Sequence, residues 1–142
     1  MEGRTAEDRL IDYVIALEAL YGNEIDELRY RLSLRAAILL GTGMEDTGFI
    51  RELISESYKL RSKIVHGKPV KPIRVIDKEV TLNELVSQLS EYVRKSILAF
   101  MSLSAHMGSQ ERIIEAIEES IINDMTRSEI IAKSKLSFTG DS

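Results

Sequence analysis

The sequence predicts an all-α protein, an antiparallel four-helix bundle with additional short helices at its C-terminal end. Three observations indicate this class. Apolar residues recur at the helical i, i+3/i+4 spacing in four long segments, the 142 residues include only two prolines, and no series of strands is visible. We therefore expect residues 1–107 to form the bundle and residues 108–142 to form a C-terminal helical arm.

The first two helices are expected between clear start and stop signals. Thr5 and Asp8 have the spacing of a capping box, and the apolar stripe that follows them ends at Gly22. A second stripe begins at Ile25 and stops at the Gly-Thr-Gly break that starts with Gly41. These segments predict two helices joined by a short connection.

The third stripe predicts a helix that starts near Asp46 or Thr47 and ends at Gly67. The two prolines of the chain follow this glycine and prevent a helix there. We therefore expect a loop as far as residue 80, with a short extended piece such as IRVI.

The fourth helix has the longest apolar stripe in the chain. Thr81 and Glu84 predict a capping box at its start, and the stripe continues to Leu103. His106 follows, next to a Gly-Ser joint. We interpret it as a helix-end residue rather than as a second catalytic base.

The C-terminal arm is expected to contain a helix over residues 112–122 and a short helix that Thr126 caps through Glu129. These short helices, followed by KLS, resemble the first part of a helix-turn-helix. The chain ends at Ser142, however, where a recognition helix would have to begin. A packing or dimerising arm is therefore preferred to a DNA-binding one.

Composition argues against several classes of protein. The chain has no Cys, which excludes disulfides, a thiolate nucleophile and a Cys-based zinc site. Its N-terminal residues are charged where a signal peptide is apolar, and its longest run without a charged residue, residues 96–110, is shorter than the ~20 apolar residues of a membrane span. We expect a cytoplasmic protein without membrane contact.

A local concentration of positive charge stands out against the net charge of −4. No acidic residue occurs between Ser57 and Ile76. The basic residues of this segment are Lys59, Arg61, Lys63, Lys68, Lys71 and Arg74. Such a segment is either a focused anion site or an ordinary solvated face and loop.

The stretch RSKIVHG, residues 61–67, has two interpretations, a helix stop or a small basic active site. His66 near a helix C-terminus and Gly67 behind it are both typical of a helix end. On an ideal helix Arg61 and His66 are about 140° apart, so they share a face only if the last turn unwinds. Ser62 and His66, four residues apart, do share one. No other catalytic motif, no metal-ligand spacing and no cofactor motif is visible.

Three segments in this order, IDYVIALEALYG, ELRYRLSLRAAILLG and YKLRSKIVHG, resemble the HEPN superfamily, and within it the Apea-like HEPN group. The resemblance extends over residues 8–106. It implies a HEPN-like helical bundle that dimerises, and a metal-independent endoribonuclease of the kind found in toxin-antitoxin and antiviral defence systems. Arg61 and His66 match the Arg-x4-6-His motif of the family, and Ser62 stands where the superfamily often has Asn, Asp or His. The resemblance also implies a nucleotidyltransferase or antitoxin partner.

The chemistry of such a site suits these residue types. RNA is cut when its own 2′-OH attacks the adjacent phosphate, which requires a proton acceptor, a proton donor and a cation. His66, with an ordinary pKa near ~6.5, can carry the proton, and Arg61 can hold the phosphate. Lys63, Lys68 and Lys71 are expected to bind flanking phosphates. Because the motif supplies one His per chain, which is too few for two proton transfers, we expect a homodimer.

Glu18 lies in the apolar run VIALEAL and should need a cation. We expect Arg31 or Arg35 to supply it. The pair is either structural, or Glu18 orients Arg61 and His66 in the site. Two alternatives to the enzyme stay open: an inactive HEPN module that binds RNA, a nucleotide or a partner protein, and an interaction module that assembles through its C-terminal helices.

Overall fold

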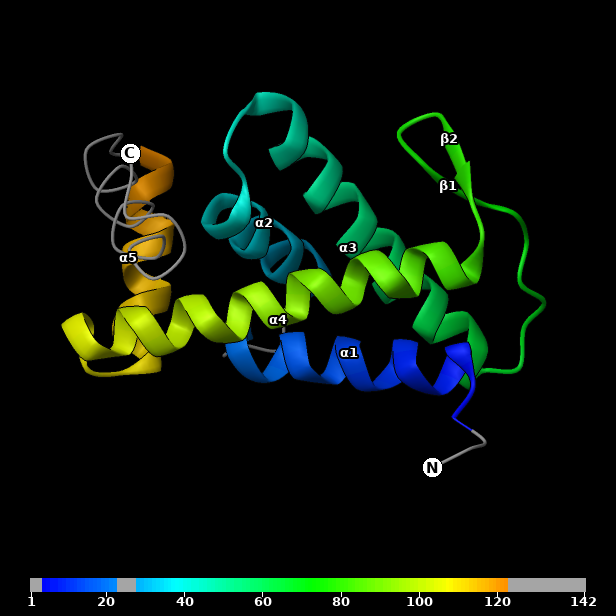
Figure 1. Cartoon of the computed structure of the whole chain (residues 1–142), viewed down its shortest axis with the longest axis horizontal. Helices are drawn as coiled ribbons and strands as arrows, with labels where there is room; N and C mark the ends of the chain where they lie inside the picture. Colours follow the sequence, from blue (N-terminus) through cyan, green and yellow to red (C-terminus); the bar gives the residue numbers. More distant parts are fainter. Residues whose placement is uncertain (1–3, 23–27, 123–142) are drawn as a thin grey trace.

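The structure, a computed structural model, describes residues 4–22 and 28–122. This part of the chain is mostly helical, which confirms the predicted all-α class, and it also contains a small two-stranded β-ribbon (Figure 1). The elements are α1 (Ala6–Tyr21), α2 (Leu28–Leu40), α3 (Met44–Val65), β1 (Ile73–Val75), β2 (Lys78–Val80), α4 (Leu82–Met107) and α5 (Gln110–Ile122).

Two helices start at the capping boxes that the sequence predicts. The Thr5 side chain accepts a hydrogen bond from the Asp8 amide at 3.0 Å, and the Asp8 carboxylate accepts one from the Thr5 amide at 3.3 Å. Thr81 and Glu84 repeat this exchange at the start of α4, at 3.1 and 2.8 Å. Each box satisfies backbone donors that the first turn of a helix leaves without a partner.

The start of α3 differs from the prediction. The helix begins at Met44, before the predicted Asp46 or Thr47. Asp46 lies inside the first turn and its carboxylate reaches back to accept hydrogen bonds from the Gly43 amide at 2.7 Å and from the Thr42 hydroxyl at 2.7 Å. The Asp46 carboxylate thus bonds the residues just before the helix from a position inside its first turn. Asp46 is therefore not the N-cap residue, and the helix starts before it.

The extended piece expected between the prolines and α4 is strand β1, and its pairing with β2 was not predicted. The two strands are antiparallel, with Ile73 opposite Val80. The turn between them places Ile76 and Asp77 at φ angles of 46° and 61°. A two-residue turn with both residues at positive φ usually carries Asn-Gly, and this sequence lacks that signal.

Helices α1 and α4 pack side by side and run in the same direction (Figure 1). At the C-terminal end of α1 the Tyr21 ring contacts Phe100 of α4 edge-on, with centroids 5.1 Å apart. The Tyr21 hydroxyl donates to the Ser96 hydroxyl at 2.8 Å, in the same buried region. The antiparallel order expected of the helices therefore does not extend to this pair.

The core lies between α1, α2, α3 and α4, and one end of it is covered by α5. Its fully buried members are mostly aliphatic and come from every helix, and they include Leu10, Leu17, Leu32, Leu39, Leu53, Ile54, Leu85, Leu89, Leu103, Ile113 and Ile117. Two of these residues belong to α5, so residues 110–122 share the core of the bundle. Neither α4 nor any other helix in the described part of the chain has the length and apolar character required to cross a membrane.

The C-terminal end of α1 is capped by side chains from distant helices. Gly22 donates its amide to the first of the four last carbonyls, residues 18–21, at 2.9 Å. The side-chain amide nitrogen of Gln110 donates to the carbonyls of residues 19 and 20, each at 2.7 Å. Buried Arg35 donates to the carbonyl of Tyr21 at 2.5 Å. A helix end normally leaves these acceptors open. Here α2 and α5 supply the donors that the last turn of α1 lacks.

The predicted start of the C-terminal helix is close to the observed one, since α5 begins at Gln110. The short helix expected around Thr126 and Glu129, and the rest of the predicted arm beyond residue 122, lie outside the described residues.

Candidate functional site

The candidate site lies at the C-terminal end of α3, where the helix closes with a Schellman motif. The Gly67 amide bonds the Ile64 carbonyl at 3.1 Å, and the Lys68 amide bonds the Lys63 carbonyl at 2.9 Å. Gly67 takes a φ of 70°, which glycine adopts without strain. The helix-stop interpretation of RSKIVHG is therefore confirmed. It explains the backbone of this stretch and does not explain its side chains.

The side chains of the same stretch line a pocket of about 250 Å³, which we call the His66 pocket. Its walls are Tyr58, Arg61, Ser62, Val65 and His66. Arg61 and His66 thus share one concavity within a single chain, although an ideal helix would place them about 140° apart. The His66 side chain reaches this pocket because its ring folds back over the last turn, with Nδ1 2.7 Å from the Ser62 carbonyl oxygen.

The His66 ring has a defined orientation. Its Nδ1 lies 2.7 Å from the Ser62 carbonyl oxygen, which only accepts hydrogen bonds. In the neutral ring Nδ1 therefore holds the proton and donates it to this carbonyl. Nε2 is left as the nitrogen that can accept or release a proton during a reaction.

Arg61 is held by a carboxylate from another helix. Its Nη1 lies 3.2 Å from Glu18 Oε2 of α1, and both side chains are about three-quarters buried. The Arg61 guanidinium carbon also lies 5.9 Å from the centroid of the Tyr58 ring. Burial raises the pKa of Tyr58, and the charge and hydrogen bond of Glu18 add to the effect against the opposing charge of Arg61. Tyr58 is therefore a neutral hydrogen-bonding group at physiological pH.

The expected partner of Glu18 was wrong. Arg31 and Arg35 both pair with Glu118 of α5, at 3.8 and 2.6 Å, whereas Glu18 pairs with Arg61 at 3.2 Å. The error arises because α1 packs against α3 along this side, so a residue 43 positions away in the sequence comes closest.

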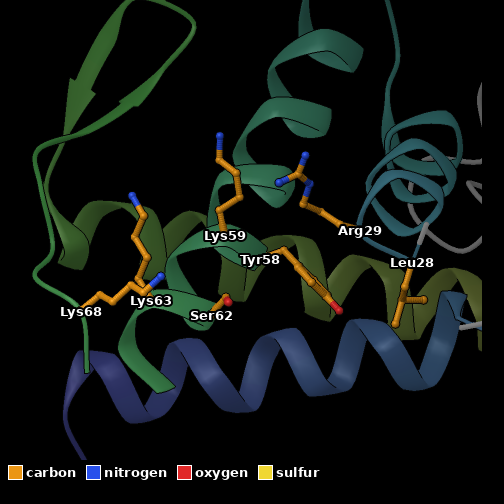
Figure 2. A pocket seen from close by; sticks show the side chains of 7 residues that line it. All are labelled: Leu28, Arg29, Tyr58, Lys59, Ser62, Lys63 and Lys68. Atoms are coloured by element: carbon orange, nitrogen blue, oxygen red, sulfur yellow. The ribbon is translucent and has the colours of Figure 1, made fainter. Parts of the chain in front are cut away.

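A larger pocket of about 540 Å³ adjoins the first one, and we call it the basic pocket (Figure 2). Tyr58 and Ser62 line both pockets. Four of the seven lining side chains are cations and none is a carboxylate; the residues are Leu28, Arg29, Tyr58, Lys59, Ser62, Lys63 and Lys68. In Figure 2 the ends of Arg29, Lys59 and Lys63 point toward the same side of the molecule. Such a group of charges favours an anionic ligand.

The predicted phosphate-binding lysines divide between two places. Lys63 and Lys68 line the basic pocket, as does Ser62. Lys71 instead lines a third, small pocket of about 40 Å³, which Lys63 also borders. His106 lies exposed in the last turn of α4, as expected of a helix-end residue.

Three polar or charged residues that line the His66 pocket or the basic pocket were not predicted as part of the site. Tyr58 precedes Arg61 by three positions and Ser62 by four, so the helical spacing alone would have placed it on their face. Lys59 lies in the basic segment and was available from the charge pattern. Arg29 comes from α2, and no local signal in the sequence connects it with α3.

No match to the chain is found among protein-family models, curated proteins or solved structures. The HEPN resemblance thus rests on the three quoted segments and stays a prediction. The described residues contain no group of three His, Asp or Glu side chains placed to hold a metal ion.

Proposed function

We propose that the protein is a HEPN-type, metal-independent endoribonuclease that cleaves RNA at the pocket formed by Arg61 and His66. The observation that carries this proposal is that both residues of the Arg-x4-His pattern line one pocket, next to a second pocket with four cations. An anion in the His66 pocket would meet a guanidinium and an oriented imidazole together.

The proposed reaction forms a bond between the 2′-oxygen and phosphorus and breaks the bond between phosphorus and the 5′-oxygen. The 2′-OH loses its proton to a base, and the leaving 5′-oxygen gains one from an acid, which gives a 2′,3′-cyclic phosphate and a 5′-OH. His66 Nε2 serves one of these transfers, and Arg61 stabilises the charge on the phosphate oxygens. Glu18 is a positioning residue that keeps the Arg61 side chain in place.

A second His66 would supply the other proton transfer, so the proposal includes a homodimer that brings two such pockets together. Its other expected features are a role in the cytoplasm, within a toxin-antitoxin or antiviral defence system, and a nucleotidyltransferase or antitoxin partner. These features are supported by the resemblance of the three segments to the HEPN superfamily.

The alternative is a catalytically inactive HEPN module that binds RNA, a nucleotide or a partner protein. One observation favours it: the basic pocket is lined without His66, so anion binding there does not require the imidazole. This alternative predicts binding that depends on Lys63 and Arg29, with no turnover.

The test is incubation of a structured RNA with the purified protein in EDTA, followed by identification of the fragment ends. The wild-type protein should give 2′,3′-cyclic phosphate ends, and His66→Ala or Arg61→Ala should slow cleavage by about 10²-fold or more. His106→Ala is the matched control, because it removes the other His of the chain from an exposed helix end.

Unchanged cleavage in His66→Ala would end the nuclease proposal for this pocket. RNA binding without cleavage by the folded wild-type protein would support the inactive binding module instead.

A further inference from the structure

A second pair of an aromatic ring and an arginine lies on the α2–α3 surface, outside both pockets. The Arg51 guanidinium carbon of α3 is 5.4 Å from the centroid of the Tyr30 ring of α2. The Tyr30 side chain is 50% exposed, and Arg51 is exposed as well. A ring and a guanidinium in this arrangement present flat surfaces to solvent on the outside of the bundle.

This pair continues the line of the two pockets. Arg51 and Tyr58 are seven residues apart on α3, so they lie on one helix face about 10 Å apart along the axis. On α2, Tyr30 directly follows Arg29, which lines the basic pocket (Figure 2). Along α3, Arg51 therefore precedes the residues that line the basic pocket, and the His66 pocket, which shares Tyr58 and Ser62 with it, extends to the end of the helix.

The order of groups along this surface matches what single-stranded nucleic acid requires. Single strands are bound by cations that follow the backbone and by aromatic or guanidinium planes on which unpaired bases stack. Here two ring-and-arginine pairs, at Tyr30 and Tyr58, flank a pocket with four cations. One of those cations, Lys59, also pairs with Glu56 at 2.8 Å, so Arg29, Lys63 and Lys68 supply most of the net charge. A duplex offers its phosphates but keeps its base faces stacked internally.

We propose that the α2–α3 surface is a binding track for single-stranded RNA, in which Tyr30 and Arg51 stack a base that lies away from the cleaved bond. The inference rests on the proposed function, since it takes the His66 pocket as the site of cleavage. It assigns the substrate class as an unpaired RNA segment that reaches beyond the nucleotides at the reacting phosphate. Tyr30 is a specificity-determining residue for that class and has no part in the proton transfers.

The test is a binding titration of the full chain with a labelled single-stranded RNA carrying 2′-O-methyl groups, which cannot be cleaved. Tyr30→Ala should weaken binding about 5- to 100-fold, the range measured for loss of one stacked base. Tyr30→Phe keeps the ring and should bind like the wild-type protein. Arg51→Ala should also weaken binding, because Arg51 stacks the same base. Its charge control is Arg94→Ala, which removes an exposed arginine of α4 that is paired with Glu91.

Two further probes identify the substrate class. A dinucleotide that fills only the His66 pocket should bind Tyr30→Ala and wild-type protein equally. A duplex of the same sequence should bind more weakly and should not respond to Tyr30→Ala. Equal single-strand affinity of Tyr30→Ala and wild-type protein, or a duplex preference, would overturn the track.

The binding and cleavage experiments together distinguish failure of the track from failure of the nuclease proposal. Loss of single-strand binding in Tyr30→Ala, together with no cleavage by wild-type protein, would support the track and refute the nuclease. Cleavage that depends on His66, with unchanged binding by Tyr30→Ala, would refute the track and leave the nuclease in place.

Discussion

Glu118→Ala should be among the most destabilising single changes of a partly exposed residue in this protein. Both Nε and Nη2 of Arg35 donate to Glu118 Oε2, at 3.2 and 2.6 Å, and the Arg35 side chain is 1% exposed. Removing one partner of a buried pair costs about 3–5 kcal/mol of unfolding free energy, because the remaining charge stays in the interior. The bond from Arg35 to the Tyr21 carbonyl survives, so the lower end of this range, about 3 kcal/mol, is expected.

The opposite change, Arg35→Met, should cost less even though it removes the more deeply buried side chain. Glu118 is 43% exposed, and water can solvate its carboxylate once the guanidinium is gone. The Tyr21 carbonyl then loses its donor, which costs about 1–2 kcal/mol for a buried acceptor left without a partner. The cost of each change is therefore set by the burial of the charge that remains.

Urea unfolding followed by circular dichroism gives the free energies that this reasoning requires. Glu115→Ala is the matched control, since it makes the same chemical change at an exposed position of the same helix and should stay within about 0.5 kcal/mol of the wild-type protein. The reasoning is refuted if Glu118→Ala is indistinguishable from Glu115→Ala, or if Arg35→Met is the more costly of the pair.

Two other predictions concern buried and capping hydrogen bonds. Tyr21→Phe and Ser96→Ala should each lower the unfolding free energy by about 1–2 kcal/mol, because each leaves a buried hydroxyl unpaired; the double variant should cost less than the sum, and additive costs in urea unfolding would contradict this. Hydrogen bonds, chiefly from the Thr42 hydroxyl, hold the pKa of Asp46 below its usual value. A folded pKa below the unfolded one stabilises the protein at neutral pH and loses this effect as pH falls through the folded value. Asp46→Asn should therefore cost about 1 kcal/mol at pH 7 and progressively less in acid, and a difference from wild type that is constant with pH would refute the argument.

The parts of the fold that the sequence predicts are those fixed within one helical turn. Thr5 and Thr81 each exchange two hydrogen bonds with the acidic residue three positions later, so four adjacent residues determine where the helix starts. The ribbon turn at Ile76 and Asp77 is a counterexample, because these residues adopt positive φ without the usual sequence signal. The direction of α1 relative to α4 was also not predictable, since it depends on long-range packing that local spacing does not define.

The same division applies to the candidate site. The residues of YKLRSKIVHG lie on one helix end, and their spacing was enough to identify Arg61, Ser62 and His66 as candidates. Their positions on a helical wheel did not predict their common pocket, because the His66 ring folds back onto the Ser62 carbonyl oxygen. The contributions of Glu18 and Arg29 come from other helices and depend on how α1 and α2 pack against α3.

In the proposed function, the basic pocket binds the RNA and the His66 pocket holds the phosphate that reacts. The positive charge of Arg61 is balanced by Glu18 at 3.2 Å, so this arginine adds little to the long-range attraction of an anion. The cations of the basic pocket lack a carboxylate among the lining residues and supply most of that attraction. Binding strength should therefore follow Arg29, Lys63 and Lys68 and fall steeply with salt, whereas the Glu18 pair keeps Arg61 oriented for the phosphate that reacts. Under the proposed function, Glu18 on the apolar side of α1 would lower the local attraction for an anion and hold the Arg61 guanidinium in a fixed orientation.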